Sequence, residues 1–260
     1  MDIIACKFGG TSTADADMFM RIQAILRRDS RRRYVVLSAP GRRGDMEKVT
    51  DMLCRAWQEK DGRAVASRFE AMARELGVKM DFREEIDRAL RISEAAALSR
   101  GEYLCARLFS LYSGIPFVDA ADVIRFDDRG RVDTGATRSA LRDMAARHPR
   151  AVIPGFYGSD PRGNIVTFPR NGSDITGALV AAGAGASLYE NWTDVPGLMT
   201  GDPAVDPEAR VIPFIRYDDM RGMPARVLHP DSLDAVEAAG IPTRIRCTMN
   251  PEAPGTLIFG

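Results

Sequence analysis

Hydrophobic positions along the chain follow two alternating spacings. Apolar runs rich in β-branched residues are too short for helices and predict buried strands, at residues 3–8, 34–38, 115–118, 151–153, 187–192 and 243–247. The segments between them repeat apolar residues at helical spacing and predict helices, at residues 18–26, 48 to about 98, 137–147, 178–184 and 232–239. Strands that alternate with helices favour a mostly parallel sheet with helices on both faces.

Two further segments matter for function. A helix is expected to begin near Ser99, which would place Glu102 in its first turn, where a carboxylate could simply serve the helix dipole. Residues 155–168 are expected to form a hairpin with Asp-Pro-Arg-Gly at its turn. The polar residues after the hairpin then stand at the mouth of the apolar helix over 178–184.

The end of the first predicted strand carries the strongest candidate chemistry. Lys7 lies at its carboxyl end, and Gly9, Gly10, Thr11 and Ser12 follow before the next helix begins. Backbone N–H groups, a helix N-terminus and one ammonium at that edge of an α/β sheet predict an anion site. The alternative is a tight turn beside a lysine that extends to solvent.

The choice of basic residues favours the anion site. Of 36 Lys and Arg residues only Lys7, Lys48, Lys60 and Lys79 are lysines, so arginine supplies most positive charge. A lysine at the end of a core strand therefore indicates a need for a compact point charge, which suits a transferring phosphoryl group. Chance retention of one lysine is the alternative.

The totals exclude several classes of function. The formal net charge is zero, which gives no support to a nucleic-acid partner. No apolar run approaches the roughly 20 residues that cross a bilayer, and no secretory segment follows Met1, so no membrane association is expected. The cysteines are widely separated and not paired with histidines, which argues against a zinc site or disulfides and favours the cytoplasm.

Several sequence blocks together resemble the catalytic domain of aspartate kinases, which are members of the amino acid kinase family. The matching blocks follow the order of that family along nearly the whole chain, at residues 7–12, 38–41 with 50–51, 101–102, 170–174, 192–195, 226–230 and 250–256. The resemblance implies a three-layer α/β/α sandwich with a mostly parallel central sheet. It also implies one domain over residues 1–260, in which residues 1 to about 165 bind the amino acid and about 166–260 the nucleotide.

The resemblance implies transfer of the γ-phosphoryl group of ATP to the side-chain carboxylate of aspartate. This reaction is the first step of the aspartate pathway to lysine, threonine and methionine. Lys7 would neutralise charge on the moving phosphoryl group, helped by the amides of Gly9 and Gly10. Mg²⁺ is expected between the ATP phosphates, held largely by them and by water, so no protein residue is named as a metal ligand.

The resemblance also assigns the two binding regions. Arg170 would hold the substrate α-carboxylate, Glu102 the α-ammonium, and Asp174 would orient Lys7 or the substrate amine. The remaining substrate-side candidates are Thr50, Asn171, Gly172 and Ser173. The remaining nucleotide-side candidates are Ser12, Thr193, Asp194, Met199, Arg226 and Val227. Helix capping is the alternative for Ser173 and Asp174, a capped turn for Thr193 and Asp194, and a surface charge for Arg170.

The chain departs from the family in the nucleotide half. Met199 replaces the usual tyrosine, Ala204 replaces an arginine, and residues 220–225 form a shortened segment. These departures leave open a binding protein that has lost catalysis. A kinase for a related amino or hydroxy acid in a specialised pathway is a second alternative, because the sequence does not define the substrate pocket.

Aspartate kinases commonly continue into ACT domains, whereas this sequence stops at Gly260. We therefore expect no feedback inhibition by lysine or threonine, and a titration that lowers activity would refute this. The resemblance makes a homodimer the expected assembly.

Overall fold

The computed structural model describes residues 2–260 apart from 170, 202–204, 207, 224–227 and 229. The strands are β1 (Ile4–Phe8), β2 (Arg32–Leu37), β3 (Ala151–Pro154), β4 (Tyr157–Ser159), β5 (Ile165–Thr167), β6 (Leu188–Thr193), β7 (Phe214–Arg216), β8 (Thr243–Cys247) and β9 (Thr256–Phe259). The helices are η1 (Thr11–Thr13), α1 (Ala16–Arg27), α2 (Val49–Glu59), α3 (Arg63–Glu75), α4 (Phe82–Leu90), α5 (Glu94–Ser113), α6 (Ala120–Val123), α7 (Thr134–Arg147), α8 (Gly172–Gly183), α9 (Tyr217–Arg221) and α10 (Pro230–Ala238).

A seven-stranded sheet forms the middle layer, in the order β3-β2-β1-β6-β8-β9-β7. All neighbouring strands in it run parallel except β8 and β9, which run antiparallel. The mostly parallel sheet predicted from the sequence is therefore confirmed. Because β1 lies between β2 and β6, Lys7 sits in the interior of the sheet, opposite Val36 and Asn191.

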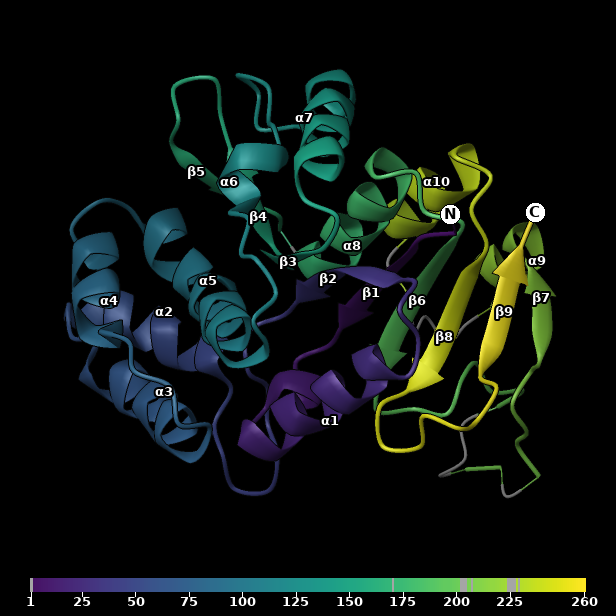
Figure 1. Ribbon diagram of the computed structural model, residues 1–260, viewed down its shortest axis with the longest axis horizontal. Coiled ribbons are helices and arrows are strands. Elements are labelled where there is room, and N and C mark those ends of the chain that lie inside the picture. Colours follow the sequence, from purple (N-terminus) through teal and green to yellow (C-terminus); the bar gives the residue numbers. More distant parts are fainter. Residues whose placement is uncertain (1, 170, 202–204, 207, 224–227, 229) are drawn as a thin grey trace.

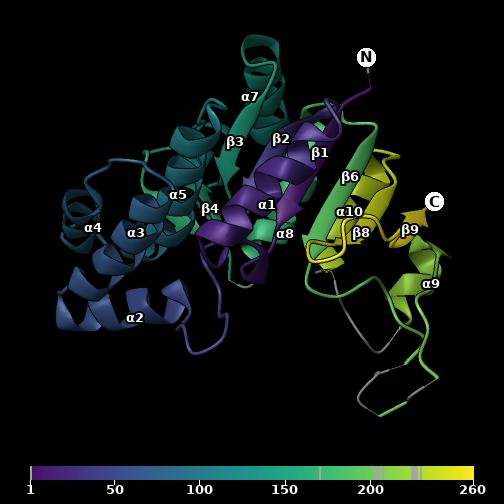
Figure 2. The same ribbon diagram turned by 60° about the horizontal axis from the view of Figure 1, so that its bottom comes forward.

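Two hydrophobic clusters cover the two faces of the sheet. Side chains of β1 at Ile4, Cys6 and Phe8 pack into a cluster with α1 to α5, whereas Ala5 packs into a second cluster with α7, α8 and α10. Figure 1 shows α2 to α5 gathered beyond one edge of the sheet, and Figure 2 shows α1 and α8 on opposite faces. The alternation of strand side chains thus sends Lys7 toward α8.

Helix ends follow the local capping chemistry. Ser93 Oγ accepts from Ala96 N–H at 3.1 Å, so α5 begins at Glu94, and Gly114 at φ 73° ends it. The prediction that this helix begins near Ser99 is therefore wrong, and Glu102 lies in the helix interior. Because Glu102 is not in the first turn, the alternative that it serves the helix dipole is excluded.

Two other element predictions need correction. Residues 115–118 form only a bridge between Phe117 and Val152, because Pro116 supplies a carbonyl but no N–H to the ladder. The helix expected over 178–184 begins earlier, at Gly172, so the polar residues before Ala178 form its first turns. The predicted hairpin is confirmed as β4 paired with β5.

Within the described part of the chain, no helix is both long and apolar enough to span a membrane.

Candidate active site

Lys7 is the centre of a small polar cluster between the sheet and α8. Its Nζ lies 2.7 Å from Asp174 Oδ1, and Asn191 Nδ2 donates to the same oxygen at 3.0 Å. Lys7 and Asn191 are both buried, and they are partners in register on adjacent strands. Asp174 comes from the first turn of α8, which packs across β1 and β6. The structure therefore brings together the two residues predicted as catalytic.

The N-terminus of α8 is built by close backbone packing. Asn171 is its N-cap at φ 49° and makes no side-chain capping bond. A Cβ on Gly172 would lie 2.9 Å from Phe156 Cα, and one on Gly155 would lie 2.5 Å from Ser173 Oγ. Because Asn171 holds the N-cap position, Ser173 and Asp174 are not N-caps, and the capping alternative for them is excluded.

Phe156 beside this helix end has an unusual backbone conformation. Its φ is +77°, a region that side-chain-bearing residues rarely adopt. Its N–H donates to Thr176 Oγ1 at 3.1 Å, and its carbonyl accepts from Phe168 N–H at 2.9 Å. Strained backbone of this kind clusters at functional sites. The residue type gives no sign of it, because phenylalanine does not favour a positive φ.

The loop after β1 leaves room at the lysine ammonium. A Cβ on Gly9 would lie 3.5 Å from Lys7 Nζ, so glycine keeps that space open. Gly9 N–H donates to Trp192 O at 3.0 Å, which continues the β1–β6 ladder by one residue. The expected help from this amide to a phosphoryl group is thus contradicted in this conformation. Gly10 N–H has no recorded acceptor among the described residues and is the amide that remains available.

Glu102 is a buried carboxyl group without full hydrogen bonding. Only 4% of the residue is exposed, and Oε2 finds no partner among the described residues. Burial raises the pKa of Glu102 to about 8, although the nearby Ala39 backbone and the Lys7 charge act in the opposite direction. An unpartnered carboxylate oxygen within the field of Lys7 is suited to a ligand that donates hydrogen bonds or carries positive charge.

A cavity of about 220 Å³ opens at the carboxyl ends of β1, β6 and β8. Ser12 and Thr248 in its lining are buried, whereas Arg42, Arg43 and Asp194 are exposed, and the other lining residues are Thr11, Thr193, Met18 and Met249. Ser12 and Thr248 share a hydroxyl hydrogen bond of 2.7 Å. The structure thus places three of the predicted nucleotide-side residues, Ser12, Thr193 and Asp194, around one cavity.

Sequence reasoning missed four residues of this region. Asn191, Thr248, Arg42 and Arg43 were not predicted. Thr248 follows directly after β8, so the rule that ligands bind beyond the carboxyl ends of parallel strands could have found it.

Other predicted residues are not brought into the site by the described structure. Thr50 is exposed in the first turn of α2, and Met199 is half-buried in a bridge with Val211. Arg170, Arg226 and Val227 lie outside the described residues, as does Ala204. A larger cavity of about 570 Å³ between α7, α8 and α10 is lined by none of the predicted site residues.

No metal-binding cluster accompanies these side chains. Across the described ranges, no three His, Cys, Asp or Glu side chains gather closely enough to hold a metal ion.

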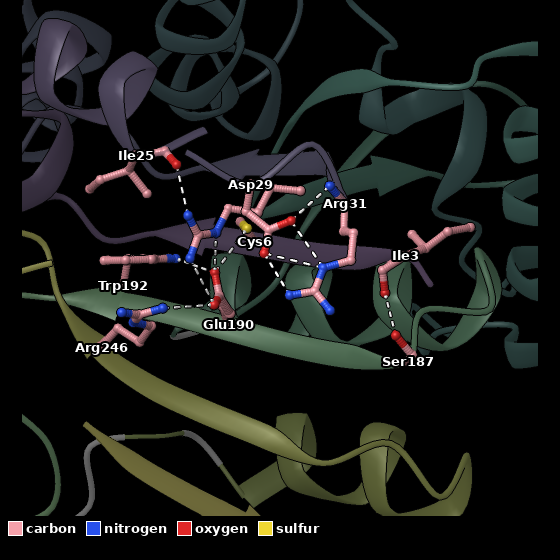
Figure 3. A network of polar contacts seen from close by, with 10 residues as sticks. Ile3, Cys6, Ile25, Asp29, Arg31, Ser187, Glu190, Trp192 and Arg246 are labelled. Carbon is pink, nitrogen blue, oxygen red and sulfur yellow. Dashed lines mark hydrogen bonds and ion pairs between the residues drawn. The ribbon is translucent and has the colours of Figure 1, made fainter. Parts of the chain in front are cut away.

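The opposite face of the same strands holds a buried ionic network (Figure 3). Glu190 accepts from Arg32 Nε at 2.8 Å, Arg246 Nη1 at 3.2 Å and Trp192 Nε1 at 3.0 Å. Burial alone would raise the pKa of Glu190, but Arg32 and Arg246 hold it below its ordinary value. The ring centroids of Phe8 and Trp192 lie 5.7 Å apart in a stacked arrangement. The stacked rings and the ionic network together hold the ends of β1 and β6 on the face opposite the site.

The chain is similar to known proteins along nearly its whole length. A sequence model described as the amino acid kinase family matches residues 2–247. The chain is 34% identical over 298 residues to lysine-sensitive aspartokinase 3 of Escherichia coli (strain K12), covering 99% of this chain and 64% of that protein.

Solved structures give the same result. The crystal structure of Clostridium acetobutylicum aspartate kinase superposes with a TM-score of 0.93 at 36% identity, over 100% of this chain and 63% of that chain. E. coli aspartokinase III in complex with aspartate and ADP gives a TM-score of 0.86 at 29% identity, over 100% and 65% of the two chains. This chain therefore spans slightly less than two thirds of each of these relatives.

Proposed function

Since the chain belongs to the amino acid kinase family, we propose that it transfers the γ-phosphoryl group of ATP to the side-chain carboxylate of L-aspartate, forming 4-phospho-L-aspartate. The observation that carries this proposal is that two buried groups lie within each other's electrostatic influence: the Lys7 ammonium, and the Glu102 carboxyl group, one oxygen of which has no partner among the described residues. An E. coli relative was solved with aspartate and ADP, which supports the same pair of ligands.

On the acceptor side, Glu102 would receive the α-ammonium of aspartate. The orphan oxygen then gains a charged donor, and the raised pKa of Glu102 means that binding must first ionise the group. Arg170 would hold the α-carboxylate as a bidentate fork, with Thr50, Asn171, Gly172 and Ser173 as neighbouring substrate residues. Their roles remain predictions.

The transfer step needs little covalent help from the protein. An oxygen of the aspartate side chain attacks the γ-phosphorus, the bond to the bridging oxygen breaks, and ADP leaves with that electron pair. No proton has to be removed from the acceptor, because its carboxylate is already ionised. Lys7 neutralises charge on the transferring group, and the Gly10 N–H supplies a second donor.

On the nucleotide side, the donor set suits a polyphosphate. The exposed Arg42, the hydroxyls of Ser12 and Thr193, and Arg43, which also pairs with Asp15, line the cavity beside Asp194. Mg²⁺, when bound, would neutralise phosphate charge while held largely by the phosphates and water. Met199, Arg226 and Val227 complete the proposed nucleotide region as predictions from the resemblance.

Trapping of the acyl phosphate with hydroxylamine tests the proposal. Purified chain with ATP, Mg²⁺ and aspartate should yield aspartyl hydroxamate, whereas asparagine, whose side chain is an amide, should yield none. A panel of related amino and hydroxy acids, read by ADP release, identifies a different acceptor. No hydroxamate from aspartate with any nucleotide would contradict the proposal.

We also place the protein in the cytoplasm as a homodimer. All four cysteines, Cys6, Cys54, Cys105 and Cys247, are free, which supports a reducing compartment. The homodimer rests on the resemblance alone, and sedimentation equilibrium of the purified chain tests it.

A further inference from the structure

Asp174 Oδ1 receives two donors from neighbouring strands. Lys7 Nζ lies 2.7 Å away on β1, and Asn191 Nδ2 lies 3.0 Å away on β6. Lys7 and Asn191 are register partners, so both side chains leave the sheet on the face covered by α8. Figure 2 shows β1 and β6 side by side with α8 behind them. One carboxylate oxygen is therefore shared between a charged donor and a neutral one.

During phosphoryl transfer, Lys7 has to leave Asp174, whereas Asn191 can stay hydrogen-bonded to it. Lys7 has to turn its charge toward a phosphate, which weakens its bond to Asp174. A buried carboxylate that loses its only partner is strongly destabilised and tends to rotate toward another donor or toward water. Asn191 is 2% exposed and its side chain is uncharged, so a phosphate attracts it far less than it attracts the Lys7 ammonium. Its hydrogen bond to Oδ1 can persist throughout the reaction.

Asparagine at position 191 suits the role of a lasting donor to Asp174 better than side chains of similar size do. Asparagine is disfavoured in strands, yet it occupies an interior position of β6 between Glu190 and Trp192. A leucine of similar shape would offer no donor to Asp174. An aspartate would place two carboxylates about 3 Å apart and hold the Lys7 ammonium between them. Of these three side chains, only the amide gives a donor without adding charge.

We infer that Asn191 is a positioning residue that keeps Asp174 in place while the Lys7 ammonium leaves it for the transferring phosphoryl group. This inference rests on the proposed kinase function and adds a residue to its machinery. Asn191 acts through Asp174 and does not itself touch the substrates.

Kinetics of three variants test the inference. Asn191→Leu should lower kcat by about 10- to 100-fold while the KM values for ATP and aspartate stay within about threefold, because the defect lies in aiming Lys7. Asn191→Asp should lower kcat at least as much despite its matching shape. Tyr189→Phe is the control, since it removes a hydroxyl bond from β6 to the Asp174 backbone carbonyl and leaves the carboxylate untouched. Its kcat should stay within about twofold.

Several outcomes overturn the inference. Unchanged kcat in Asn191→Leu, a change in KM alone, or an equal loss of kcat in Tyr189→Phe would show a merely structural role. Should Asn191→Leu fail to fold, Asn191→Asp carries the same comparison with the control.

Crystal structures without substrates separate this inference from the proposed function, with Lys7→Met standing in for departure of the ammonium. The Asp174 carboxylate should keep its position in Lys7→Met, where Asn191 still donates to it, and should rotate away in the double variant that also carries Asn191→Leu. An Asp174 carboxylate in the same position in both variants overturns the inference whether or not the wild-type chain phosphorylates aspartate. Failure of the wild-type chain in the hydroxamate assay instead overturns the proposed function alone.

Discussion

At the scale of single residues, the site depends on two ionisable groups held in opposite ways. Lys7 has a charge partner within hydrogen-bond distance, whereas Glu102 has one oxygen with none. Asp174 can return Lys7 to its starting position after each turnover. Glu102 is poised to gain stability only when a positively charged ligand arrives.

Replacement of Lys7 should abolish most of the activity. Lys7→Ala removes the charge that meets the transferring phosphoryl group, and we expect kcat to fall by about 100- to 1,000-fold. Lys7→Arg keeps the charge but carries a bulky planar group into the space above Gly9, so it should recover only part of the loss. Initial rates of hydroxamate formation measure both variants. A lysine-to-alanine variant that changes KM alone would contradict the assignment.

Glu102 should make stability fall as pH rises. Its folded-state pKa is about 8 and its ordinary value is 4.5, so the folded protein binds the extra proton between these values. The free energy of unfolding therefore decreases from pH 4.5 to about 8. Glu102→Gln should lose this part of the slope. Urea unfolding of both proteins across that range is the measurement, and parallel curves would show that Glu102 is already ionised in the folded protein.

The residue scale also shows what the sequence could reveal. The scarcity of lysine and the strand end were enough to select Lys7. The family resemblance selected Glu102 as a site residue. Its burial was not predicted, because the helix was expected to begin near Ser99 and Glu102 was therefore placed in an end turn and not in the helix interior. Asn191 could not be found, since its relation to Lys7 depends on the register between β1 and β6, which local sequence does not encode.

At the scale of elements, the close packing of α8 on the sheet determines the distance between Asp174 and Lys7. Gly177 lies where a Cβ would come within 2.5 Å of the Tyr189 hydroxyl and 2.9 Å of Lys7 Cβ. The absence of a side chain allows α8 to lie directly on β1 and β6. Asp174, one turn earlier in α8, then reaches Lys7.

Gly177→Ala should therefore damage both stability and activity. The added methyl group pushes α8 away from β1, at a cost of about 1–3 kcal/mol, and lengthens the Lys7–Asp174 contact. Gly135→Ala in α7 is a matched control, because its Cβ would lie 3.5 Å from Asp133 Oδ1 in ordinary contact. We expect the control to gain about 0.4–1 kcal/mol and keep its kcat. Equal effects in thermal unfolding and in kcat would refute the role of Gly177.

Element predictions succeeded where the spacing of apolar residues was decisive. The strands that contain Lys7 and Asn191, and the hairpin of β4 and β5, were predicted within a few residues. The early start of α8 was missed because Gly172, Ser173 and Asp174 have weak helix propensity, and tertiary packing against Gly155 and Phe156 overrides it. Strands β7 and β9 were missed because segments of four residues or fewer carry little periodic information.

At the scale of the whole molecule, the candidate site and a buried ionic network lie on opposite faces of the sheet. One face carries Lys7, Asp174 and Asn191 under α8, and the other carries the Glu190 network. That network joins four neighbouring strands, since Cys6 lies on β1, Arg32 on β2, Glu190 on β6 and Arg246 on β8. Arg246 also donates to Pro251 O at 2.6 Å, which fixes the turn after Thr248.

Breaking this network should destabilise the whole domain. Glu190→Ala leaves the buried guanidinium of Arg32 and the half-buried one of Arg246 without their carboxylate, and we expect a loss of about 3–5 kcal/mol. Because the pKa of Glu190 is lowered in the folded protein, its contribution is present above pH 4.5 and is lost as pH falls below that value. Urea unfolding at pH 7 and at pH 4 measures both effects. A variant as stable as wild type at pH 7 would disprove the network's role.

The most direct test is a crystal structure of this chain with aspartate and a non-hydrolysable ATP analogue bound together. We predict that the aspartate ammonium lies within hydrogen-bond distance of Glu102 Oε2. The terminal phosphate should lie against Lys7 Nζ, with the other phosphates in the cavity beside Ser12 and Thr193. Ligands seated instead in the cavity between α7, α8 and α10, with the space above Lys7 closed by packed side chains, would contradict it.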